Sequence, residues 1–100
     1  MTGWADRFAR FRMATAAALL DRDGATPPAT RRSIAGGTSP GDLQALVDKI
    51  RSRAYTVTDA DVDALRRQYS EDQLFEIIVA AAFGAASDRL AAAHRALEEA

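Results

Sequence analysis

The sequence predicts an all-α protein, and three observations support this fold class. Three predicted helices start with an N-capping residue that has an acidic or amide partner three residues on: Ser39, Thr58 and Ser70. About a quarter of the 100 residues are alanine, which favours helix over strand. Only residues 55–58 form a run of β-type side chains, and this run is too short for a strand between two capped helices.

The first predicted helix covers residues 2–20, and one packing stripe recurs along it at helical spacing. The stripe consists of Trp4, Phe8, Phe11, Thr15 and Leu19. We expect it to dock on the domain or on a neighbouring subunit. The alternative is a membrane-surface anchor or a targeting peptide, but Asp6 lies among the arginines and residues 13–20 are short for a secretory core.

A turn at residues 21–25 precedes a short predicted helix, which starts at the prolines 27–28 and ends at the glycines 36–37. Arg31 and Arg32 lie on this helix and are expected to form a solvated face. The alternative is that they bind a phosphate or a carboxylate. The two glycines match neither the GxGxxG nor the GxxxxGK[ST] pattern, so they form no such phosphate-binding loop.

The remaining helices are predicted over residues 40–54, 59–67 and 71–98. The last one carries the stretch that should organise the fold, residues 74–90, because its large apolar side chains point in every direction around the helix. Small residues between them allow other helix backbones to approach closely. We therefore expect a long, central, buried helix that is covered by the rest of this chain or by a second copy.

Length and composition indicate a single domain, residues 1–100, with an N-terminal helical arm (1–37) and a core (38–100). Large apolar residues are few, so we expect homo-oligomerisation to complete the core. The net charge of −1 gives no electrostatic footprint for nucleic acid or for an anionic membrane. The chain has no cysteine, which excludes disulfides and thiol chemistry and is compatible with the cytoplasmic location that we expect.

The turn at residues 67–70 joins a short predicted helix to a long one, as in a helix-turn-helix DNA-binding protein. A recognition helix needs a polar or basic N-terminal face that reaches phosphates and base edges. Glu71, Asp72 and Glu76 occupy this position here and would repel the DNA backbone. We therefore expect no nucleic-acid partner.

The order of several segments carries a resemblance to a known superfamily. Residues 46–51 (LVDKIR), 54–62 (AYTVTDADV) and 69–76 (YSEDQLFE), followed by the small-residue stretch 80–90, resemble the alkylhydroperoxidase D and carboxymuconolactone decarboxylase superfamily. The similarity is greatest to a cysteine-free branch of small proteins in it, and it covers residues 43–97. It implies an all-helical fold whose subunits associate as dimers, trimers or higher rings and complete one another's cores.

The resemblance also implies which chemistry is missing. Redox members carry a CxxC motif and a histidine, and one cysteine attacks a peroxide or disulfide that the other resolves. The cysteine positions fall near Arg53 and Thr56 and the histidine near Ala60 or Asp61, so none of these side chains is present. Gln68 stands about where relatives place a glycine. We therefore expect no peroxidase activity.

The decarboxylase side of the superfamily uses acid-base groups around a bound lactone and needs no metal or organic cofactor. The catalytic candidates here are Glu76, Tyr55 and Asp61, and Arg89 is the candidate for binding an anionic substrate. The alternative for Arg89 is an ion pair between helices or subunits. His94, the only histidine, is expected on the surface, and we expect no metal site because no carboxylate cluster accompanies it.

Glu76 is the most informative candidate. It lies between two apolar residues of the central helix, so burial is expected to raise its pKa toward that of a useful base. The alternative is a solvated carboxylate near the helix start, or one that pairs with an arginine: Arg51, Arg53 or Arg66.

Two functional hypotheses from different classes remain. The first is a thiol-free member of the superfamily, a homo-oligomer that binds a small organic molecule at a subunit interface and acts on it by acid-base chemistry. The second is a non-catalytic assembly or regulatory interaction module. A buried Glu76 with a raised pKa beside a cavity would favour the first hypothesis, and solid packing there would favour the second.

Overall fold

The computed structural model describes the backbone of residues 3–99 and the side chains of residues 6, 7 and 9–99. These residues form helices and no strand, which confirms the all-α class. The elements are α1 (Gly3–Ala16), the π-helical turn η1 (Ala17–Asp21), α2 (Pro28–Ala35), α3 (Gly41–Arg53), the 3₁₀ turn η2 (Ala54–Thr56), α4 (Asp59–Asp63) and α5 (Glu71–Glu99). The side chains of Trp4 and Phe8 from the predicted N-terminal stripe lie outside the described residues.

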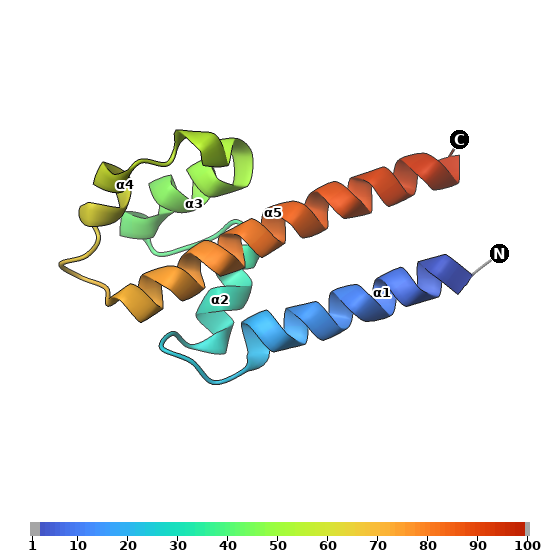
Figure 1. The fold of residues 1–100 in the computed structure, drawn as a ribbon, viewed down its shortest axis with the longest axis horizontal. Coiled ribbons are helices and arrows are strands. Elements are labelled where there is room, and N and C mark those ends of the chain that lie inside the picture. The colour runs from blue at the N-terminus through green and yellow to red at the C-terminus, as the bar shows by residue number, and fades with distance from the viewer. Residues whose placement is uncertain (1–2, 100) are drawn as a thin grey trace.

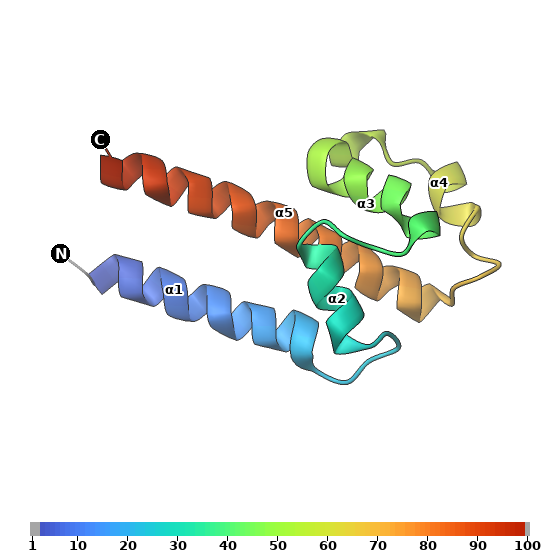
Figure 2. The same cartoon turned by 180° about the vertical axis from the view of Figure 1, so that it is seen from behind.

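The helices are arranged as a small globule with two extensions. α1 and α5 run antiparallel, so the two ends of the chain lie at the same end of the molecule (Figure 1). α2 crosses near the middle of α5, and α3 and α4 lie beside the N-terminal half of α5. The view from behind shows α1 and the C-terminal part of α5 extending away from the globule (Figure 2). We call these extensions, α1 and residues 87–99 of α5, the two arms.

The core lies between α2, α3 and the N-terminal half of α5. Its most deeply buried large side chains are less than 2% exposed: Ile34, Leu43, Val47 and Ile77. The predicted central position of α5 is confirmed on the face that packs against α2 and α3. Burial all around residues 74–90 is wrong for the single chain, because Phe75 and Leu90 are 68% and 47% exposed.

The predicted contact through small residues of α5 is confirmed. Ala80 and Ala81 are at most 1% exposed, and Gly84 is buried against the C-terminal end of α2. A Cβ atom at Gly84 would overlap the carbonyl oxygen of Ala35, so only glycine allows α2 to approach this closely. This close approach fixes where α2 crosses α5, and with it the direction in which the preceding segment leaves the core.

Two of the three predicted N-caps are confirmed. Thr58 and Asp61 form a capping box, and Ser70 and Gln73 exchange the same pair of hydrogen bonds, at 3.1 Å to Ser70 Oγ and 2.8 Å to Gln73 Oε1. The cap at Ser39 is wrong, because α3 begins after Pro40 and the Ser39 amide instead donates to the Gln44 side chain at 3.1 Å. No helix in the described part of the chain is long and apolar enough to cross a membrane.

Candidate functional site

Glu76 lies on the second turn of α5 and holds the loop that precedes α2. Its carboxylate accepts hydrogen bonds from the backbone N–H groups of Ala25 at 2.7 Å and Thr26 at 2.9 Å, and from the Thr26 hydroxyl. Arg31 Nε lies 3.6 Å from Glu76 Oε1. A Cβ atom at Gly24 would come within 2.7 Å of the same carboxylate, so this glycine leaves the space that Glu76 fills.

These contacts lower the pKa of Glu76, and the hydrogen bond from the Thr26 hydroxyl is the largest cause. Desolvation raises the pKa, but it is outweighed by that hydrogen bond together with the two backbone N–H groups and the positive charge of Arg31. The expected rise in pKa is therefore wrong. The alternative, pairing with an arginine, is correct, although the partner is Arg31 on α2 rather than Arg51, Arg53 or Arg66.

Arg31 is the centre of this polar cluster. Its residue is 3% exposed, and its guanidinium donates to the carbonyl oxygens of Leu19, at 3.0 Å, and of Arg22. The solvated face expected for both arginines is thus wrong for Arg31 and correct for Arg32, which is exposed and pairs with Asp21. The spacing contains the missed signal, because Arg31 precedes the fully buried Ile34 by three residues and so shares its face of the helix.

Together, these residues form a polar clasp, which we define as Glu76, Arg31 and Thr26 with the backbone groups that they bind. The clasp joins the end of η1, the loop before α2, and α5. Because η1 continues directly from α1, the clasp also determines the direction of α1. Both oxygens of Glu76 are engaged by groups of the same chain, which is the arrangement of a structural carboxylate rather than of a base open to a substrate.

The other predicted site residues lie in different parts of the fold. Tyr55 lies on η2 and is 87% exposed. Asp61 accepts from Lys49 Nζ at 2.9 Å, and this hydrogen bond is the largest cause that lowers the pKa of Asp61. Arg89 Nη2 donates to the Arg51 carbonyl oxygen at 2.9 Å, which is a hydrogen bond from α5 to the backbone of α3 and not the ion pair of the alternative.

His94 Nε2 lies 3.3 Å from Glu98 Oε1, one turn further along α5. The His94 residue is only partly exposed, so its predicted surface position is correct in part. Among the residues that the structure describes, no group of three or more histidine, cysteine, aspartate or glutamate side chains is placed to hold a metal ion. None of the contacts given above joins Glu76 to Tyr55, Asp61 or Arg89, so the described contacts do not assemble the candidates into one site.

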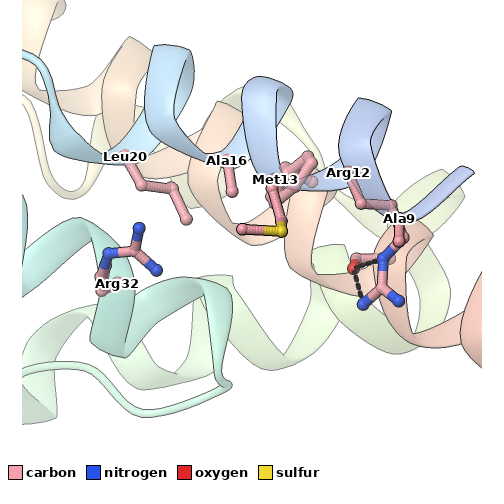
Figure 3. Close-up of a pocket in the computed structure, with 8 residues that line it drawn as sticks. Ala9, Arg12, Met13, Ala16, Leu20 and Arg32 are labelled. Atoms are coloured by element: carbon pink, nitrogen blue, oxygen red, sulfur yellow. Dashed lines mark hydrogen bonds between the residues drawn. The ribbon is translucent and has the colours of Figure 1, made fainter. Parts of the chain in front are cut away.

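A cavity of about 370 Å³ lies where α1 passes α2 and α5, and we call it the arm groove. It is lined by Ala9, Arg12, Met13 and Ala16 of α1, Leu20 of η1, Arg32 of α2, and Phe83 and Ser87 of α5. Figure 3 shows Arg12 near one end of this groove and Leu20 and Arg32 at the other end, with Met13 and Ala16 between them. Sequence reasoning missed this site, because it forms only where α1, η1, α2 and α5 meet.

The end of the arm groove near Arg12 is closed by a polar bridge between the arms. Arg12 donates from Nε and Nη2 to Ser87 Oγ, at 3.3 and 3.0 Å (Figure 3). Because Ser87 accepts both bonds, its own hydroxyl proton is directed elsewhere. The groove thus combines an apolar wall with hydrogen-bond donors at one end, which is the usual composition of a small-molecule site.

Comparison with known proteins gives no assignment: no protein-family model, curated protein or solved structure matches the chain. The resemblance to the alkylhydroperoxidase D superfamily therefore stays a prediction.

Proposed function

We propose that this protein is a helical homo-oligomer that assembles through its two arms, and that its role is assembly rather than catalysis. The observation that carries the proposal is the exposure of large apolar side chains along both arms. Phe11 and Met13 on α1 are 66% and 72% exposed, and Leu90 and Leu97 on α5 are 47% and 66% exposed. Leu90 and Leu97, seven residues apart, lie on one face of α5, and exposed apolar surface along a helix face is typical of a protein interface.

The size of the chain's surface supports the same proposal. The accessible area is 6,578 Å², whereas a compact monomer of 10.7 kDa should expose about 5,500 Å². The excess of about 1,000 Å² is comparable to the roughly 800 Å² that each partner buries in a stable interface of standard size. The radius of gyration, 15.0 Å against about 13 Å for a compact 100-residue domain, indicates an extended shape of the same kind.

The charges of the arms favour a second copy of the chain as the partner. The described side chains of α1 include three arginines and one aspartate, which give a charge of +2. Residues 87–99 of α5 carry two arginines, one aspartate and two glutamates, which give −1 with His94 neutral. α1 of one copy is therefore attracted to the α5 arm of another, and two antiparallel pairs of arms can close into a four-helix bundle.

The contacts of Glu76 favour assembly over acid-base chemistry. Its carboxylate is occupied by donors of its own chain and its pKa is lowered, so it is a weak base at neutral pH. The proposal retains the oligomeric architecture that the superfamily resemblance implies. It also retains the expected lack of peroxidase activity, because the chain has no cysteine.

A pair of matched variants tests the proposal. Leu97→Glu places a charge among the apolar side chains of an arm, and Tyr55→Glu places the same charge on η2, at another large exposed residue outside the arms. We expect Leu97→Glu to reduce the mass measured by light scattering to that of the monomer, and Tyr55→Glu to leave the mass of the assembly unchanged. Far-UV circular dichroism should show both variants as helical as the wild type. Assembly that survives Leu97→Glu, or is lost equally in both variants, would contradict the role of the arms.

A further inference from the structure

We propose that α5 pairs with the α5 of a second copy, antiparallel and about a twofold axis at Ala86. This inference rests on the proposed function, because it names the surface through which two copies join. It also goes beyond the arms, since residues 75–86 of the surface lie outside them. The surface, which we call the outer stripe, is a continuous row of apolar residues on α5: Phe75, Val79, Ala82, Ala86, Leu90, Ala93 and Leu97.

The outer stripe is a single helix face. Its members follow one another at intervals of three or four residues, so they fall within a sector of about 80° at 3.6 residues per turn. All of them are exposed except Val79, which is half-buried. From residue 75 to residue 97 the stripe is about 33 Å long on one uninterrupted helix (Figure 1). The charged residue closest to it around the helix, Arg89, is directed to α3 by its hydrogen bond to the Arg51 carbonyl oxygen.

The single chain covers only the opposite face of α5. There Ile77, Ala81 and Gly84 are buried against α2 and α3. A helix that is apolar on both faces is typical of a helix buried on both sides. The outer stripe nevertheless leaves Phe75 and Leu97 68% and 66% exposed. A second copy can cover it, because the stripe is complementary to itself.

Antiparallel pairing about Ala86 sets large side chains of one copy opposite small ones of the other at most levels of the stripe. At the axis the two Ala86 residues meet, which allows the helix axes to approach to about 8 Å. A parallel pair would set every residue opposite its own copy, so Leu90 would meet Leu90 and the alanines between would leave gaps. In the antiparallel register the facing pairs, each occurring twice by symmetry, are Phe75 with Leu97, Val79 with Ala93, and Ala82 with Leu90.

A cavity beside Phe75 supports this register. It has a volume of about 440 Å³, and besides three charged residues it is lined by Val62 of α4 and by Leu74, Phe75 and Ile78 of α5. Two of the charged residues, Arg66 and Glu71, pair with each other at 2.9 Å. The apolar lining is therefore left for an apolar side chain. The antiparallel register brings Leu97 of the second copy to Phe75, at this cavity.

The pairing agrees with the four-helix bundle proposed for the arms. α1 faces Phe83 and Ser87 of α5 across the arm groove. These two residues lie about 60° and about 100° around the helix from the centre of the outer stripe. The second α5 and α1 therefore occupy neighbouring sides of α5, as adjacent helices do in a four-helix bundle.

The test uses single-cysteine variants, because the chain has no cysteine of its own. With axes about 8 Å apart and Cα atoms about 2.3 Å from each axis, the two Ala86 Cα atoms lie within the roughly 7 Å that a disulfide spans. Ala86→Cys, oxidised with copper phenanthroline, should therefore form a cross-linked dimer on a non-reducing gel. Ala92→Cys is the matched control and should stay unlinked, because Ala92 is also exposed but lies about 120° away around the helix.

A mixture of two variants distinguishes antiparallel from parallel pairing. In the antiparallel register the two copies of residue 82 are about 12 Å apart along the helices, and so are the two copies of residue 90. Ala82→Cys and Leu90→Cys should each stay unlinked alone and should cross-link to each other after subunit exchange in an equal mixture. A parallel pair would give the opposite result, since each variant would cross-link to itself.

Phe75→Glu separates this inference from the proposed function, because Phe75 lies outside the arms. We expect it to reduce the mass measured by light scattering at least twofold, as Leu97→Glu does, while far-UV circular dichroism shows an unchanged helix content. An unchanged mass for Phe75→Glu, no cross-link in Ala86→Cys, equal cross-linking in Ala92→Cys, or self-linked Ala82→Cys would overturn the pairing and leave an oligomer joined through the arms. A wild-type mass of 10.7 kDa would overturn both proposals.

Discussion

Replacing Gly84 with alanine adds one methyl group at the closest contact between α2 and α5. The new Cβ would overlap the carbonyl oxygen of Ala35 and would lie 2.5 Å from Arg51 Nη1, which itself donates to that oxygen. The obstacle is backbone rather than the end of a flexible side chain, so α2 has to move away from α5. Overpacking of this kind costs up to about 3 kcal/mol.

The alanine also improves the helix propensity of α5, which returns about 1 kcal/mol. The predicted net loss in the free energy of unfolding is therefore about 2 kcal/mol, or roughly 10 °C in Tm for a domain of this size. Urea titration followed by far-UV circular dichroism measures it. Gly41→Ala is the matched control, because nothing lies within 4 Å of a Cβ atom there, and it should be neutral or stabilising. Equal or greater stability of Gly84→Ala would refute the argument that glycine is required at this contact.

The polar clasp gives the remaining predictions. Arg31→Met should lower the free energy of unfolding by about 3 kcal/mol, because it leaves the Glu76 carboxylate without its buried cation. The control Arg32→Met should change the free energy of unfolding by less than about 0.5 kcal/mol. Urea titration measures both variants, and similar losses would argue against a special role for Arg31. The pKa of Glu76 in the folded protein lies below its ordinary value of 4.5. The ionised carboxylate therefore stabilises the fold fully at pH values above 4.5, and this stabilisation is lost as the pH falls through the pKa of the folded protein. Glu76→Gln should therefore be less stable than the wild type at pH 7 by about 2 kcal/mol, and the difference should shrink below pH 4. A difference that is independent of pH would mean that the carboxylate charge is not what the clasp uses.

Local signals in the sequence were sufficient for much of the fold. The capping pairs at Thr58 and Ser70 involve residues three apart, so their hydrogen bonds depend on nothing distant in the chain. The small residues of α5 likewise predicted a close helix contact, and Gly84 makes one with α2. Ser39 failed as a cap because its N–H and its hydroxyl both donate to Gln44 Oε1, in the place where a capping box would use Asp42, and a short-range pattern does not reveal which acceptor is used.

The contacts of the candidate residues could not be predicted in the same way. Glu76 meets Thr26 across 50 residues of sequence, and the donors that lower its pKa come from a loop whose position depends on where α2 crosses α5. Burial alone would have raised that pKa, so the direction depended on partners that no spacing indicates. The arm groove is also a product of tertiary packing, because its lining combines side chains of α1, η1, α2 and α5.

The solution mass of the wild-type protein tests the central claim most directly, measured by light scattering over a concentration series. The account predicts a mass of at least twice 10.7 kDa, with dissociation toward 10.7 kDa only on dilution, because the proposed assembly buries the exposed apolar side chains of the arms. A mass of 10.7 kDa at every concentration would contradict it and would show that the arms remain exposed in the native protein.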